Sequence, residues 1–220
     1  MLGRIVSTAP TESLWGTATT IGEQALDVLI EKIHEVKRAR KVLSLVTSDL
    51  QGAFNEVHTK VLCGRLRQRL IPDDLTKWIK DFCSGRQGSI VVGKHCTTQR
   101  QIEHVGISQG SPLSPILFIF YKANLVGQRI NRKEGSVGFV NDYTTWVTSN
   151  SEEEATAFLQ ATIMPKATRW AEESGVTFEA DKTGFIHFTR GQGDPYTPLR
   201  FGDVDIYPQP HVKILSLIHI

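Results

Sequence analysis

Residues 137–148 read VGFVNDYTTWVT, two runs of β-type residues that meet at Asn141-Asp142. Val, Phe, Tyr, Trp and Thr are enriched in strands, and an Asn-Asp pair suits the tight turn of a hairpin. The stretch therefore predicts two antiparallel strands with Asn141 and Asp142 in the turn. Upstream, Val42–Thr47 is another β-type run, which ends at Ser48-Asp49. We expect its end to lie beside the turn of the hairpin, at one edge of a sheet.

Helices are predicted where apolar residues recur at intervals of three and four. These segments are 20–40, 59–70, 75–82, 112–130 and 152–174, the last interrupted near Pro165 and ended by Gly175. Further β-type segments are a hairpin around Gly93-Lys94, then Phe178, 185–189 and a final strand in 212–220. Strands that alternate with helices but are joined partly by hairpins indicate an α+β fold. We expect a mixed or antiparallel sheet with helices on one face.

Composition and charge exclude few functions. The 220 residues are 40% hydrophobic and 22% charged, with a net charge of +2 at pH 7. A nucleic-acid partner is therefore permitted but not required. Arg65, Arg67 and Arg69 fit either a solvated helix face or contacts with template phosphates. No apolar run reaches membrane-spanning length and the first ten residues do not resemble a secretory signal, so we expect an intracellular protein without a membrane partner.

The three cysteines, Cys63, Cys83 and Cys96, are an odd number, and their spacing matches no zinc motif. The nearby His95 and His104 do not complete one. Cytosolic and nuclear proteins seldom form disulfides. We therefore expect three reduced, partly buried thiols.

Two aspartates stand where chemistry is expected. Asp49 ends a predicted strand and Asp142 lies in the predicted hairpin turn. Hard divalent ions prefer oxygen ligands, and two such ions about 4 Å apart can hold both the attacking and the leaving oxygen of a phosphoryl transfer. Either aspartate alone is ordinary, because Asp often ends strands and occupies turns. Together they predict a two-metal site at one edge of the sheet.

The residues around both aspartates resemble a known family. The relevant stretches are SLVTSDLQGAFNEV at 44–57, ISQGSPLSPILF at 107–118, GFVND at 138–142, FEADKT at 178–183 and HVKIL at 211–215. In order and spacing they resemble the palm motifs of reverse transcriptases, and within that family the enzymes of non-LTR (LINE-like) retrotransposons, especially fungal ones. The resemblance extends from about residue 20 to residue 215.

The resemblance implies a fold and an activity. We expect a polymerase palm with part of the fingers over residues 20–215, preceded by a loop or frayed segment at 1–19. Residues 216–220 would be a truncated end, with the thumb absent. The implied activity is RNA-directed DNA polymerisation with Mg²⁺ or Mn²⁺, acting on an RNA template, a DNA primer and dNTP. A nuclear location is implied, a mitochondrial one less so, and the oligomeric state is not predicted.

Roles for single residues follow from the same resemblance. Asp49 would bind both metal ions together with Asp142, and the Leu50 carbonyl would add an oxygen ligand. Phe54 would exclude a 2′-hydroxyl from the incoming sugar, with a core aromatic as the alternative.

Three more positions complete the expected site. Gln109 and Gly110 would face the nascent base pair, where a missing side chain lets the backbone approach closely. Lys182 would donate a proton or neutralise charge at the leaving pyrophosphate, with a simple exposed lysine as the alternative.

The sequence departs from the family at Asn141. The family turn carries two aspartates, and the first of them, replaced here by Asn141, is expected to share the metals with Asp49. We therefore expect a degenerate site with little or no polymerisation. Two other functions stay open: a non-catalytic nucleic-acid-binding remnant, and a decayed open reading frame without a selected role.

Overall fold

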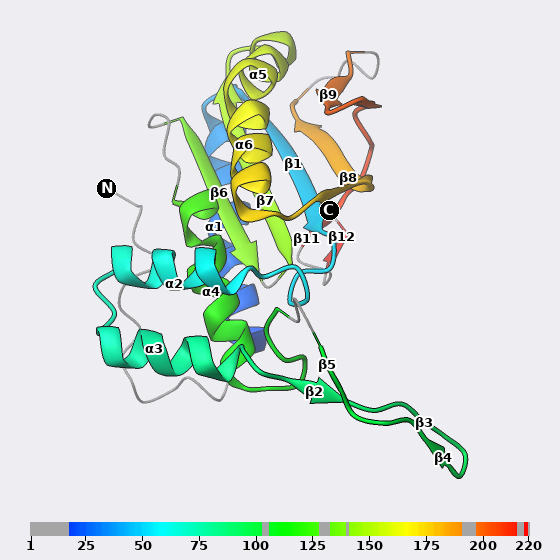
Figure 1. The fold of residues 1–220 in the computed structure, drawn as a ribbon. Coiled ribbons are helices and arrows are strands. Elements are labelled where there is room, and N and C mark those ends of the chain that lie inside the picture. Colours follow the sequence, from blue (N-terminus) through cyan, green and yellow to red (C-terminus); the bar gives the residue numbers. More distant parts are fainter. Residues whose placement is uncertain are drawn as a thin grey trace.

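The computed structural model describes residues 18–102, 106–127, 133–139, 141–190, 197–214 and 218–219. Its centre is a four-stranded sheet with the strand order β6-β7-β1-β8 (Figure 1). The strands are β1 (Val42–Leu50), β6 (Glu134–Phe139), β7 (Asp142–Ser149) and β8 (Phe178–Phe188). Every neighbouring pair is antiparallel, which confirms the α+β class. Most of the predicted segment 1–19 lies outside the described residues.

Helices cover both faces of this sheet, so the prediction of helices on one face is wrong. Leu43 and Leu45 of β1 pack with Leu29 and Ile33 of α1 (Ala18–Arg38) on one face. The alternate residue Val46 belongs to the cluster on the opposite face. Residues along a strand point alternately to its two faces, and almost the whole of β1 is buried. The near-continuous apolar run of β1 is typical of such a two-sided strand.

The second face is covered by one long helical segment. It consists of α5 (Glu152–Phe158), a π-helical turn (Leu159–Ile163) and α6 (Met164–Ser174). The interruption expected near Pro165 is this π-helical turn, because proline has no N–H for the helical hydrogen-bond pattern. Gly175 ends the segment with a φ of +66°, as predicted. An unpredicted hairpin, β9 (Leu199–Phe201) and β10 (Val204–Ile206), completes the cover.

A third cluster lies below the sheet, among α2 (Thr59–Gln68), α3 (Asp73–Phe82) and α4 (Leu113–Val126) (Figure 1). Arg65 of α2 is buried within it, so neither a solvated face nor a phosphate contact describes this residue. Its guanidinium donates to the Tyr121 carbonyl and to Ser174 Oγ, 2.6 Å away. Arg65 thus ties α2 to α4 and α6.

The ends of the described chain differ from the prediction. The run 212–220 is not one strand, because β11 (Lys213–Ile214) pairs antiparallel with β12 (Ile218–His219). Residues 212–220 contain no Gly, Pro, Asn or Asp that would signal a turn, so the reversal could not be predicted from the sequence. Between α3 and α4, four short strands form a projecting arm: β2 (Gln87–Gly88), β3 (Val91–Val92), β4 (His95–Cys96) and β5 (Arg100–Gln101) (Figure 1).

The three cysteines are free, as expected, but they are not alike. Cys63 and Cys83 are buried, whereas Cys96 is exposed on the arm, which corrects the expectation that all three are partly buried. Burial raises the pKa of both the Cys63 and the Cys83 thiols. Within the described ranges, no helix combines the length and apolar character needed to cross a membrane.

Candidate active site

Asp49 and Asp142 meet across two neighbouring strands. The β1–β7 register pairs Asp49 directly with Asp142. Residues directly opposite each other in an antiparallel pair project from the same face of the sheet. Asp142 is 4% exposed and Asp49 is half-buried. Two carboxyl groups 93 positions apart in the sequence are therefore brought to one end of the sheet, at the place that the motifs predict.

The hairpin turn is shifted by one residue from the predicted position. The β6–β7 register pairs Phe139 with Asp142, so Asp142 is the first residue of β7 and not part of the turn. Asn141 lies in the turn, and its carbonyl accepts a hydrogen bond of 3.0 Å from the Leu50 N–H. The turn is thereby fastened to the end of β1. Asn141, Asp142 and Asp49 are neighbours along the two strand ends.

A buried lysine, which sequence reasoning missed, lies against this hairpin. Lys122 of α4 is 3% exposed, and its Nζ donates to the Asp142 carbonyl at 2.7 Å. Burial lowers the pKa of Lys122 to about 7, although the negative charge of Asp142 opposes the shift. A Cβ on Gly138 would lie 2.8 Å from Lys122 Cε, so the glycine leaves room for the lysine. The signal in the sequence was a single lysine inside the apolar helix LSPILFIFYKANLV.

A third carboxyl-bearing residue lies on the other side of Asp49. The β1–β8 register pairs Asp49 with Glu179, beyond an irregularity between Thr47 and Asp49. In the described part of the chain, no group of three or more His, Cys, Asp or Glu side chains is arranged so that it could hold a metal ion. The carboxylates present fit divalent-cation chemistry by type, but the side chains form a pair and not a complete ligand cluster.

Lys182 forms an ion pair with Glu179 beside this pair of carboxylates. The hydrogen bond that the Lys182 ammonium donates to Glu179 raises the pKa of Lys182, and the charges of Glu179 and Asp49 act in the same direction. A raised pKa keeps the ammonium charged and makes it a weaker acid. This favours charge neutralisation over proton donation for Lys182. A cleft of about 260 Å³ lined by Thr47, Lys182 and His211, among others, borders it.

The other predicted residues lie around the same end of the sheet. Phe54 is partly buried, and its ring lies 5.5 Å from that of Phe118 in an edge-to-face contact, which agrees with the core alternative. Its carbonyl accepts a hydrogen bond of 2.9 Å from the Ile107 N–H. Gln109 and Gly110 are exposed just before α4. Gly110 has a φ of +85° and open space in front of it, so backbone conformation already requires glycine there.

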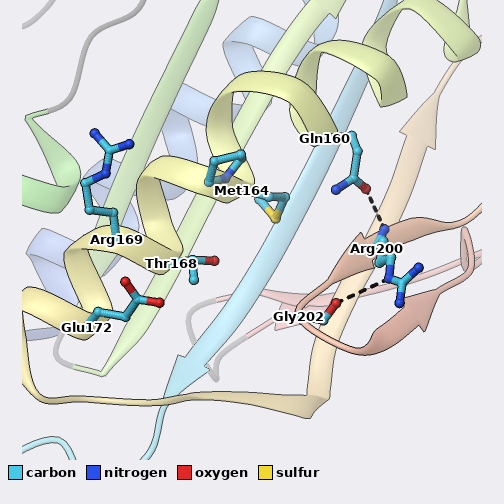
Figure 2. Close-up of a pocket in the computed structure, with 8 residues that line it drawn as sticks. Gln160, Met164, Thr168, Arg169, Glu172, Arg200 and Gly202 are labelled. Carbon is cyan, nitrogen blue, oxygen red and sulfur yellow. Dashed lines mark hydrogen bonds between the residues drawn. The ribbon is translucent and has the colours of Figure 1, made fainter.

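A second cavity lies away from these residues. It has a volume of about 370 Å³ and is bordered by α6 and the β9–β10 hairpin. Figure 2 shows Gln160 accepting from the Arg200 N–H, with Arg169 and Glu172 pointing out from α6. None of the predicted site residues lines it.

Comparison with known proteins gives the family. The profile described as "Reverse transcriptase (RNA-dependent DNA polymerase)" matches residues 10–218. The chain belongs to this family. It is 29% identical over 151 residues to the RNA-directed DNA polymerase from mobile element jockey of Drosophila funebris, covering 66% of this chain and 16% of that protein. It is also 30% identical over 103 residues to a reverse transcriptase-like protein of Chlamydomonas reinhardtii, covering 47% of this chain and 25% of that protein.

Solved structures agree on the fold. Telomerase from Candida tropicalis in complex with a fragment of telomeric RNA aligns with a TM-score of 0.59 and 10% identity, covering 84% of this chain and 32% of that chain. The apo form truncated from the C-terminal domain aligns with a TM-score of 0.56 and 12% identity, covering 90% and 39%. The chain therefore spans a quarter or less of these two curated relatives and under two fifths of these two structures.

Proposed function

We propose that this chain is the reverse transcriptase palm of a non-LTR retrotransposon, with a metal site that has lost one carboxylate. The observation that carries the proposal is the direct pairing of Asp49 with Asp142 across β1 and β7, in a chain of this family. The relatives named for mobile elements support the retroelement origin. The substrates would be an RNA template, a DNA primer and dNTP.

Asp49 and Asp142 would hold Mg²⁺ or Mn²⁺, with the Leu50 carbonyl as a further oxygen ligand. Bound metal would lower the energy of the charge that develops on the transferred phosphoryl group. Lys182, held charged by Glu179, would neutralise the leaving pyrophosphate. Phe54 would contact the sugar of the incoming nucleotide. Gln109 and Gly110, which closely follow the Ile107 hydrogen bond to Phe54, would face the nascent base pair.

Asn141 would make this site slow. A neutral amide in the turn replaces the negative charge that would face the cations, while the backbone of the turn tolerates either residue. By analogy with breaking a buried ion pair, the loss is about 3–5 kcal/mol. At about 1.4 kcal/mol per factor of ten, the rate falls roughly a hundredfold to a few thousandfold.

Primer extension on an RNA template tests this proposal. The unaltered chain and the Asn141→Asp variant are compared in Mg²⁺ and in Mn²⁺, with Asn141→Asp/Asp49→Asn as the control that removes the paired carboxylate. We expect extension by Asn141→Asp, little by the unaltered chain and none by the control. Equal extension by the first two would overturn the role given to Asn141. No extension by any variant would leave nucleic-acid binding without turnover as the better description.

A further inference from the structure

The two-stranded arm formed by residues 86–102 projects from the body of the protein (Figure 1). β2 pairs with β5 at its base, and β3 pairs with β4 near its tip. The Ile90 N–H donates to Thr97 Oγ1 at 2.9 Å, and the Thr97 N–H donates to the Ile90 carbonyl at 3.0 Å. In the part of the chain that the structure describes, no third strand pairs with either edge of the arm. The arm is thus an ordered ribbon with free edges.

The segment of the arm that contains β3 and the preceding Ile90 is apolar and exposed. Ile90, Val91 and Val92 are 67%, 66% and 70% exposed. Three consecutive β-branched residues favour a strand, but a lone two-stranded ribbon buries too little surface to hold them in a core. Exposed apolar strands with free edges are a liability that proteins normally cover or use for binding. This exposure indicates a partner for the arm.

The charge of the arm points to a polyanion. The sequence between Phe82 and Ile102 contains Arg86, Lys94 and Arg100 and no Asp or Glu. The chain as a whole is nearly balanced, with 25 Lys and Arg against 23 Asp and Glu. A one-signed segment in a balanced chain creates a local positive field. Phosphates of a nucleic-acid backbone complement that field, whereas a purely apolar partner surface does not.

The base of the arm is attached close to the candidate site. The chain that returns through β5 reaches Ile107, whose N–H donates to the Phe54 carbonyl. Phe54 follows Asp49 by five positions, in the segment that leaves β1. The arm therefore extends outward from the end of the sheet that carries the paired aspartates. A strand of nucleic acid held at that end can reach the arm.

We propose that this arm is a nucleic-acid contact, in which Lys94 and Arg100 bind backbone phosphates of the primer–template and Ile90–Val92 lie against its sugars and base edges. An RNA–DNA heteroduplex is A-form, and its wide, shallow minor groove is open to a two-stranded ribbon. Apolar side chains contact the minor groove in other nucleic-acid-binding proteins. The inference rests on the proposed function for the identity of the ligand. It assigns a surface outside the predicted site residues.

Cys96 provides a direct probe of this contact. It lies on β4 opposite Val91 and is the exposed one of the chain's three cysteines. We expect a DNA primer annealed to an RNA template to slow alkylation of Cys96 by N-ethylmaleimide, in proportion to the fraction of protein bound by fluorescence anisotropy. Unchanged alkylation at full binding would overturn the proposal. Protection that depends on protein concentration without nucleic acid would assign the arm to a protein partner, which also overturns it.

A salt series tests the phosphate contacts separately. Removing two contacts in Lys94→Ala/Arg100→Ala is expected to lower the slope of log affinity against log salt by about 2. Lys94→Arg/Arg100→Lys keeps both charges and should keep the slope. Lys37→Ala/Lys41→Ala is the matched control, because both lysines are exposed at the far end of β1 from Asp49. An unchanged slope in the first variant would contradict the assignment.

The outcomes separate this inference from the proposed function. Binding of primer–template that does not depend on the arm would contradict a nucleic-acid contact at the arm and would leave the palm assignment unchanged. Arm-dependent binding without extension by Asn141→Asp supports the arm and removes the catalytic proposal. A chain that binds no primer–template at all removes both.

Discussion

Lys122 and Arg65 are charged side chains held inside the molecule, and each makes its environment sensitive to substitution. Lys122 has a pKa of about 7 in the folded chain, against an ordinary value of 10.5. Between these values the unfolded chain binds more protons than the folded one. The free energy of unfolding therefore rises with pH in this window through Lys122. The physical cause is the desolvation of the ammonium.

The Lys122→Met variant should lack this dependence. The difference in unfolding free energy between the native chain and the variant should change by about 1.4 kcal/mol per pH unit between pH 7 and 9. Urea unfolding at several pH values measures it. The two proteins are compared because both also contain Cys63 and Cys83. The raised pKa of these thiols lowers the free energy of unfolding as pH rises through the ordinary thiol pKa, and this effect cancels in the difference. Parallel plots of unfolding free energy against pH for the two proteins would show that burial does not lower the pKa of Lys122.

Arg65 is a structural residue on this account. Its guanidinium lies over the Tyr121 ring at 4.6 Å from the ring centroid, besides its hydrogen bonds to Tyr121 and Ser174. Arg65→Ala removes buried partners and should lower the free energy of unfolding by about 3 kcal/mol. Arg67→Ala is the control, because its ion pair with Asp73 is exposed and contributes at most about 1 kcal/mol. Equal losses in urea unfolding would refute the distinction.

At the scale of elements, the C-terminal end of α6 depends on Gly175. Its φ of +66° disfavours other residues, and a Cβ there would lie 2.4 Å from His58 Nε2. Gly175→Ala therefore combines backbone strain with a steric clash.

We expect Gly175→Ala to lower the midpoint of thermal unfolding more than Gly202→Ala. Gly202 has a φ of +62° but nothing within 4 Å of the added Cβ, so it carries the strain alone. That strain is about 1–2 kcal/mol. Calorimetry measures the midpoint of thermal unfolding of both variants. A larger decrease for Gly202→Ala would contradict a steric clash at Gly175.

The elements show which features a sequence can give. Apolar spacing located the helices, and β-type runs with turn residues located β1, β6 and β7, because these signals are local. The sequence could not predict which helices cover the two faces of β1. That packing depends on contacts between residues far apart in the chain, such as those that bring Leu29 to one face while Val46 is buried on the other. The β9–β10 hairpin, with three-residue strands, carries too weak a periodic signal to be predicted.

The candidate site was predictable in part for the same reason. The family motifs identified Asp49 and Asp142, and the strand register brings them together. The one-residue shift of the turn depends on pairing between Phe139 and Asp142 and not on turn composition. Lys122 and Glu179 reach the site through tertiary packing and register, which no local pattern encodes.

At the scale of the whole molecule, the match to the reverse transcriptase family extends over nearly all of the chain. The family profile covers residues 10–218, and the fold aligns with a telomerase structure over 90% of the chain. Under the proposed function, Asn141 lowers the negative charge of the metal site, whereas the backbone of the turn accepts either Asn or Asp. Fold and metal binding should therefore respond differently when that charge is restored.

Mn²⁺ binding, followed by electron paramagnetic resonance titration, tests whether Asp49 and Asp142 form a metal site that Asn141 weakens. The native chain, Asn141→Asp and Asn141→Asp/Asp49→Asn are compared at a temperature at which all three proteins are fully folded. We predict tighter Mn²⁺ binding by Asn141→Asp than by the native chain, and loss of that gain when Asp49 is also replaced. Equal Mn²⁺ affinity in all three proteins would contradict a metal site at the paired ends of β1 and β7.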